Sequence, residues 1–67
     1  MITVFINGVA RQLKDSYTIE VLIAELGYTG RRIALELNGD IVPRSLYAER
    51  VVTEGDKLEI VVAVGGG

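Results

Sequence analysis

The segment Leu58-Glu59-Ile60-Val61-Val62-Ala63 leads directly into Val64-Gly65-Gly66-Gly67. Successive side chains of a β-strand point to opposite faces, and β-branched residues are favoured there. The segment therefore predicts a strand over residues 58–64 that buries one apolar face. That face carries Leu58, Ile60, Val62 and Val64.

The glycines that follow predict a flexible tail formed by Gly65, Gly66 and Gly67. Glycine has no Cβ, so the tail can adopt φ of either sign and enter a channel too narrow for other residues. The α-carboxylate of Gly67 is ionised at neutral pH and is a poor electrophile, so another protein must activate it. A frayed end or a cloning remnant is the alternative, but the glycines adjoin an apolar strand instead of a polar boundary.

The first half of the chain predicts a hairpin and a helix. Alternating apolar residues indicate strands over Met1–Asn7 and Val9–Leu13, with Asn7-Gly8 as the tight turn between them. The helix is predicted between a cap at Thr18 and a left-handed stop at Gly27. Its apolar side chains recur at i, i+3, i+4 and i+7: Ile19, Leu22, Ile23 and Leu26.

The second half predicts shorter elements. A strand is expected over Ile33–Leu37, and Asn38-Gly39 indicates a second hairpin turn before the apolar pair Ile41-Val42. We expect one helical turn within Ser45–Glu49 and a brief strand at Val51-Val52.

This order of elements predicts an α+β fold in which one helix covers one face of a mixed, four- to five-stranded sheet. Residues 1–64 would form a single domain, and residues 65–67 its tail. The first and last strands should lie side by side and parallel, because a long crossover separates them.

Such a sheet would bring Phe5 close to Val61 and Ala63 on the face that the helix leaves uncovered. We interpret these three residues as a docking patch for a partner that receives the tail. Scattered apolar residues are also ordinary on a protein surface, which is the alternative interpretation.

The composition excludes several classes of function. The chain of 67 residues has no cysteine and no histidine, which excludes disulfides, thiolate nucleophiles and Cys or His zinc sites. A domain this small commits most of its apolar residues to one core, so we expect no bound cofactor or metal. A net charge of −2 argues against nucleic acid as a partner. Because no signal peptide or membrane-spanning stretch is recognisable, we expect a cytoplasmic protein that does not bind membranes.

Three segments carry a resemblance to a known family: Leu37–Ser45 (LNGDIVPRS), Glu54–Ile60 (EGDKLEI) and the glycine terminus. A Gly-Asp turn before a strand that ends in Gly-Gly is shared by prokaryotic sulfur carriers. The Asn-Gly-x-Ile-Val-Pro-Arg pattern is more particular to the thiamine branch. Over its whole length the chain resembles the thiamine-biosynthesis sulfur carriers, the ThiS family of ubiquitin-like β-grasp proteins. Gly65 departs from the family's minimal two-glycine ending.

The resemblance implies a carrier that is not itself an enzyme. A ubiquitin-activating-type adenylyltransferase would consume ATP to convert the carboxylate of Gly67 into an acyl-adenylate. Sulfur delivered as a persulfide, originating from a cysteine desulfurase, would displace AMP to give a thiocarboxylate. Thiazole synthase would use that sulfur for the thiazole ring of thiamine. By this analogy Gly67 carries the sulfur and Gly66 completes the required pair.

Three alternatives stay open at this point. The small subunit of molybdopterin synthase also ends in Gly-Gly, although that family tends to carry prolines where this chain has Val61-Val62-Ala63-Val64. A ubiquitin-like modifier would join lysines through the same terminus. A stand-alone enzyme would have to use Arg44 with Asp40 or Asp56, but such turn charges are far more often solvated.

Overall fold

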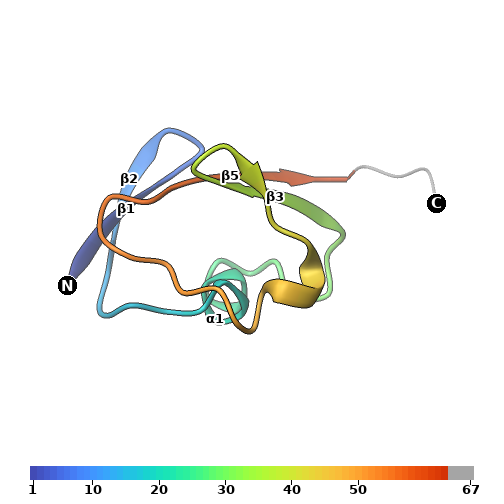
Figure 1. Ribbon diagram of the computed structural model, residues 1–67, viewed down its shortest axis with the longest axis horizontal. Helices are drawn as coiled ribbons and strands as arrows, with labels where there is room; N and C mark the ends of the chain where they lie inside the picture. Colours follow the sequence, from blue (N-terminus) through green and yellow to red (C-terminus); the bar gives the residue numbers. More distant parts are fainter. Residues whose placement is uncertain (64–67) are drawn as a thin grey trace.

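The computed structural model of the protein describes residues 1–63. Its strands form one sheet in the order β2-β1-β5-β3-β4, and α1 crosses one face of that sheet (Figure 1). The predicted α+β fold, with one helix on a mixed sheet, is confirmed, and the sheet has five strands. The elements in chain order are β1 (Ile2–Ile6), β2 (Val9–Leu13), α1 (Ile19–Glu25), β3 (Ile33–Leu37), β4 (Asp40–Ile41), the 3₁₀ helix η1 (Arg44–Leu46) and β5 (Lys57–Val62).

β5 occupies the centre of the sheet but is paired unequally on its two sides. It runs antiparallel to β3 from Leu58 to Val62. It runs parallel to β1, as predicted, but the register with β1 covers only Lys57 and Leu58. β5 begins one residue earlier than predicted, and the predicted position of Val64 lies outside the part of the chain that the structure describes.

The core fills the space between α1 and the inner face of the sheet. No polar or charged side chain among residues 1–63 is buried, so this core is entirely apolar. Burying one large aliphatic side chain contributes about 1.5–3 kcal/mol. Apolar burial is therefore the main stabilising term. The largest fully buried side chains are Ile19, Leu22, Leu35, Leu58, Val4 and Val52.

α1 begins and ends as the sequence predicts. The Thr18 hydroxyl accepts a hydrogen bond from the Val21 N–H at 3.2 Å, which satisfies one of the free donors of the first turn. Gly27 has φ +84°, the left-handed conformation that stops the helix. None of the helices within residues 1–63 has the length and apolar character required to cross a membrane.

The elements between β3 and β5 are shifted from their predicted positions. β4 is Asp40–Ile41 instead of Ile41-Val42. Val42 keeps one hydrogen bond to β3, from its N–H to the Leu35 carbonyl at 3.0 Å, and is followed by Pro43, which has no N–H to continue the pairing. The 3₁₀ helix also starts one residue before the predicted Ser45–Glu49 segment. These short elements follow tertiary packing more than local propensity.

The strand predicted at Val51-Val52 is reduced to a single antiparallel bridge between Thr18 and Val51. The Val52 N–H donates to the Tyr17 carbonyl at 2.8 Å, and the Val52 side chain is fully buried. This segment therefore fixes the start of α1 against the rest of the domain.

Candidate functional site

The candidate site is the end of β5, where the described chain leaves the sheet. Val62 lies opposite Ile33, and the Ala63 N–H donates to the Arg32 carbonyl at 2.8 Å. β3 therefore holds the backbone up to the last described residue. The predicted sulfur-attachment residue Gly67 and the rest of the predicted tail lie outside residues 1–63.

The predicted docking patch is divided between two parts of the sheet. Phe5 is in register with Lys57, at the start of β5. Val61 lies four residues further along the strand, roughly 13 Å away at the usual rise per residue. The expectation that Phe5 lies close to Val61 and Ala63 is therefore wrong.

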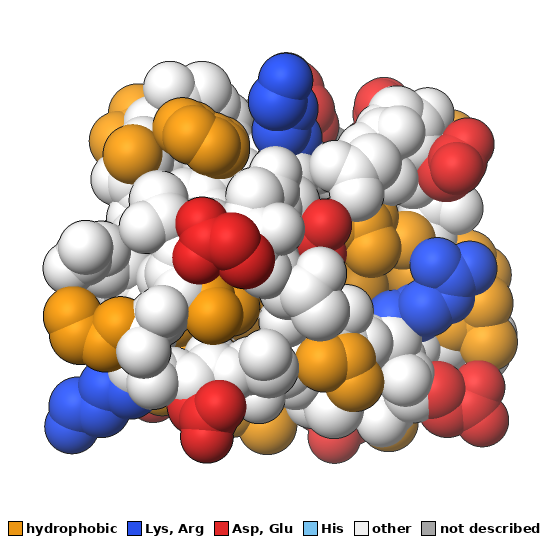
Figure 2. Space-filling view, turned by 60° about the vertical axis from the view of Figure 1, so that its left-hand side comes forward, with side chains coloured by type: hydrophobic (Ala, Val, Ile, Leu, Met, Phe, Trp, Pro, Cys, Tyr) orange, Lys and Arg blue, Asp and Glu red, His pale blue; other side chains and the backbone are white. Residues whose placement is uncertain are grey.

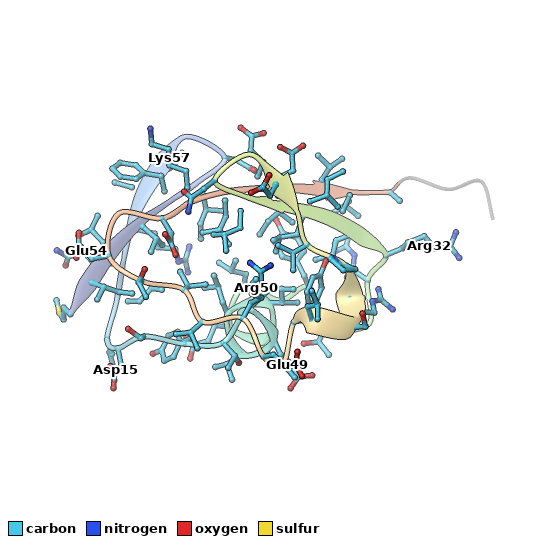
Figure 3. The ribbon with its side chains drawn as sticks, in the orientation of Figure 1. Asp15, Arg32, Glu49, Arg50, Glu54 and Lys57 are labelled. Carbon is cyan, nitrogen blue, oxygen red and sulfur yellow. The ribbon has the colours of Figure 1, made fainter. Side chains whose placement is uncertain are left out.

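The cause of this separation is the stagger between β1 and β5. The parallel pairing aligns the end of β1 with the beginning of β5, so the second half of β5 extends past the β1–β2 hairpin (Figure 1). Figure 3 shows the result: Lys57 lies near the hairpin, whereas Arg32 projects from the opposite end of the sheet. Only the second of these ends is adjacent to the root of the predicted tail.

Three small apolar side chains remain together at that end, on the face opposite α1. Val61 is 61% exposed and pairs with the exposed Ala34 across the strands, and Ala63 follows on the same side of β5. We call Ala34, Val61 and Ala63 the tail-side patch. The paired carboxylates Glu36 and Glu59 form the next row of the sheet and separate this patch from Phe5.

Two of the charges considered for a stand-alone enzyme, those of Arg44 and Asp56, serve separate structural contacts. The Arg44 Nη2 donates to the Arg31 carbonyl at 3.2 Å. The Asp56 carboxylate accepts from the Asn38 Nδ2 at 3.0 Å and from the Thr53 N–H at 2.8 Å. On the face seen in Figure 2, acidic, basic and apolar side chains are interspersed. Within residues 1–63 no group of three or more His, Cys, Asp or Glu side chains is placed to hold a metal ion.

Asn7 completes the pairing of β5 at the point where β1 ends. Its N–H donates to the Leu58 carbonyl at 2.9 Å, and its φ of +52° then turns the chain away. The side-chain Oδ1 accepts from the Ile60 N–H at 2.8 Å, while Nδ2 donates to the Ile60 carbonyl at 3.1 Å. The side-chain amide therefore replaces the peptide groups that a longer β1 would offer. The sequence indicated Asn7 as a turn residue but gave no sign of this second role.

Replacing Asn7 with glycine tests that role, because glycine accepts positive φ without strain. We expect Asn7→Gly to lower the free energy of unfolding by about 1–3 kcal/mol, since it removes two hydrogen bonds and leaves the Ile60 groups without these partners. Asn7→Asp keeps the acceptor but puts a carboxylate oxygen where Nδ2 faces the Ile60 carbonyl, so we expect this variant also to be less stable than the parent. Urea denaturation measures the effect. A glycine variant as stable as the parent would show that the side-chain pairing contributes nothing.

The sheet order, the single crossing helix and the central last strand define the ubiquitin-like β-grasp class of proteins. Residues 4–67 match the ThiS family. The chain belongs to that family, as its sequence predicted.

Individual proteins agree with this assignment. The chain is 30% identical to the sulfur carrier protein ThiS of Escherichia coli K12 over 64 residues, covering 96% of this chain and 97% of that protein. It is 52% identical over 62 residues, 92% of its length, to a thiazole synthase of Paramagnetospirillum magneticum, but spans only 19% of that longer protein. The crystal structure of the thiamine biosynthesis protein ThiS from Geobacter metallireducens has the same fold. Its TM-score is 0.83 at 24% identity, with 98% of this chain and 100% of that chain covered.

Proposed function

We propose that this protein is the sulfur carrier for thiazole formation in thiamine biosynthesis, acting as a protein co-substrate in the cytoplasm. The observation that carries the proposal is the family match over residues 4–67, which continues from the central strand β5 into the terminal glycines. The carrier would hold no cofactor of its own.

The chemistry proceeds in steps catalysed by other proteins. On an adenylyltransferase of the ubiquitin-activating type, the Gly67 carboxylate attacks the α-phosphorus of ATP and releases pyrophosphate, which leaves an acyl-adenylate. The terminal sulfur of a persulfide, supplied by a cysteine desulfurase, then displaces AMP. A thiol cleaves the resulting S–S bond and leaves a thiocarboxylate on Gly67. Activation is required because the free carboxylate resists nucleophiles.

Thiazole synthase is the proposed acceptor of that sulfur. In the relative from Paramagnetospirillum magneticum, a domain 52% identical to this chain is part of a longer protein named thiazole synthase. Joining two proteins in one chain raises their effective concentration toward each other. Such a fusion is what we expect of a carrier and an enzyme that act in succession.

The geometry of β5 supports a partner contact close to the end of that strand. β3 fixes the backbone as far as Ala63. The four residues from Val64 to Gly67 span at most about 14 Å when fully extended. A partner that takes Gly67 into its active centre must therefore approach the domain near Ala63, where the tail-side patch lies.

The substitution Val61→Asp tests this contact. A carboxylate in the tail-side patch would have to lose water on docking, so we expect the KM for the carrier to rise about tenfold in adenylation or sulfur transfer. Ile41→Asp is the matched control: Ile41 is 75% exposed on the same face, but on the edge strand β4. Equal KM values for the two variants would contradict docking at the patch.

Intact-mass spectrometry tests the proposed function. The carrier is incubated with ATP, the adenylyltransferase, a cysteine desulfurase and cysteine. We expect free protein heavier by the difference between sulfur and oxygen. Isopeptide conjugates to lysine would support a ubiquitin-like modifier, and sulfur accepted only by molybdopterin synthase would support that pathway. An unchanged mass in the complete mixture would contradict the proposal.

A further inference from the structure

The β1 side of β5 stops being paired before the strand ends. The register between β1 and β5 ends at Leu58, and the Asn7 side chain extends the pairing to Ile60. Beyond that point the β1–β2 hairpin has turned away, and β5 continues past it (Figure 1). Val62, two residues further on, is the next position that faces this side.

The direction of the Val62 backbone groups follows from the antiparallel ladder with β3. Hydrogen-bonded and non-hydrogen-bonded pairs alternate along such a ladder. The Ala63 N–H donates to the Arg32 carbonyl, so Ala63 faces β3, and Val62 opposite Ile33 is a non-hydrogen-bonded pair. The N–H and C=O of Val62 therefore point away from β3. Within residues 1–63 no strand is in register with Val62 on that side.

An N–H and a C=O directed outward from a strand edge form a template for another extended backbone. Proteins commonly block such edges with lysine or proline. Neither lysine nor proline occurs at this edge, whose sequence is Ile60-Val61-Val62-Ala63. The outer-face side chains beside it, Val61 and Ala63, are small and uncharged, so they do not obstruct an approaching strand.

We propose that an extended segment of thiazole synthase adds to this edge of β5 and pairs with the N–H and C=O of Val62. This inference rests on the proposed function, and the fusion of a similar domain to thiazole synthase supports the choice of partner. Pairing there fixes the direction of the backbone three residues before Gly65. It thereby reduces the ordering cost of about 1–2 kcal/mol per residue for threading the glycines into the enzyme.

Two substitutions at one position separate backbone pairing from side-chain contact. Val62→Pro removes the N–H that faces the open edge, and proline is tolerated where a strand's N–H has no ladder partner. Val62→Ala keeps the N–H and removes only methyl groups. For the parent chain and purified thiazole synthase, we expect Val62→Pro to raise the Kd about tenfold or more. We expect Val62→Ala to stay within about threefold of the parent Kd.

Amide hydrogen exchange provides a readout that needs no substitution. The Val62 N–H of the free carrier should exchange rapidly and should become protected, by about tenfold or more, in the complex with thiazole synthase. If a folded Val62→Pro variant binds like the parent, or if exchange of the Val62 N–H is unchanged in the complex, the strand pairing at Val62 is refuted. The proposed function is not affected by either result. Protection of Val62 by self-association of the free carrier would also overturn the inferred strand pairing. Failure of the parent chain to bind thiazole synthase would instead contradict the proposed function.

Discussion

Replacing Gly66 with valine is expected to abolish thiocarboxylate formation while the free energy of unfolding stays unchanged. In the proposed function the predicted tail enters a partner's active centre as bare backbone, so a branched side chain next to Gly67 would both clash with the channel and restrict φ. A displacement of about 1 Å at a reacting group can cost about a hundredfold in rate. We therefore expect a loss of at least about a hundredfold in the initial rate, measured by intact mass.

The matched control for this variant is Ala10→Val, which adds methyl groups to an exposed position of β2 away from the end of β5. It should form the thiocarboxylate at the parent rate. Urea denaturation of both variants should give the parent stability. A Gly66→Val variant that accepts sulfur at the parent rate would defeat the steric argument for the tail.

Leu58→Ala is expected to remove a large part of the free energy of unfolding. Leu58 is 1% exposed at the centre of the sheet, and truncation of a buried leucine costs about 2–5 kcal/mol. At about 0.05–0.15 kcal/mol per residue, a domain of 67 residues has a total stability of only about 3–10 kcal/mol. The truncation therefore removes much of the total, and transfer of sulfur should fall with the folded fraction.

Val61→Ala is the control on the same strand. Val61 is 61% exposed, so its truncation should change the free energy of unfolding by no more than about 0.5 kcal/mol. Urea denaturation of the two variants measures the difference directly. Similar losses for Leu58→Ala and Val61→Ala would contradict the assignment of the buried face of β5.

The strands and the helix could be predicted because each has a local signal. Alternation of apolar residues predicted the strands β1, β2, β3 and β5. The helical spacing of apolar residues predicted α1, and Thr18 and Gly27 predicted its two ends. β4 and η1 were displaced by a residue because short elements have too few positions for a pattern.

The register between β1 and β5 could not be predicted. Alternation of side chains fixes which face of a strand is buried, but not how far two strands distant in sequence are staggered. The wrong expectation that Phe5 lies close to Val61 arose because this stagger was unknown. The open edge at Val62 depends on the same stagger, because it exists only where β1 stops short of the end of β5. The sequence could indicate the chemistry of the tail, but not the surface beside it.

In the function proposed above, the terminal carboxyl of this chain carries the sulfur of the thiazole ring. Transfer of isotopically heavy sulfur from the carrier to the product measures this step. Carrier loaded with the heavy isotope at Gly67 is mixed with thiazole synthase and its other substrates, in the presence of an unlabelled sulfur source. We expect thiazole product that contains the heavy isotope, and carrier that returns to the mass of its carboxylate form. Unlabelled product, with the heavy sulfur still on the carrier, would contradict it.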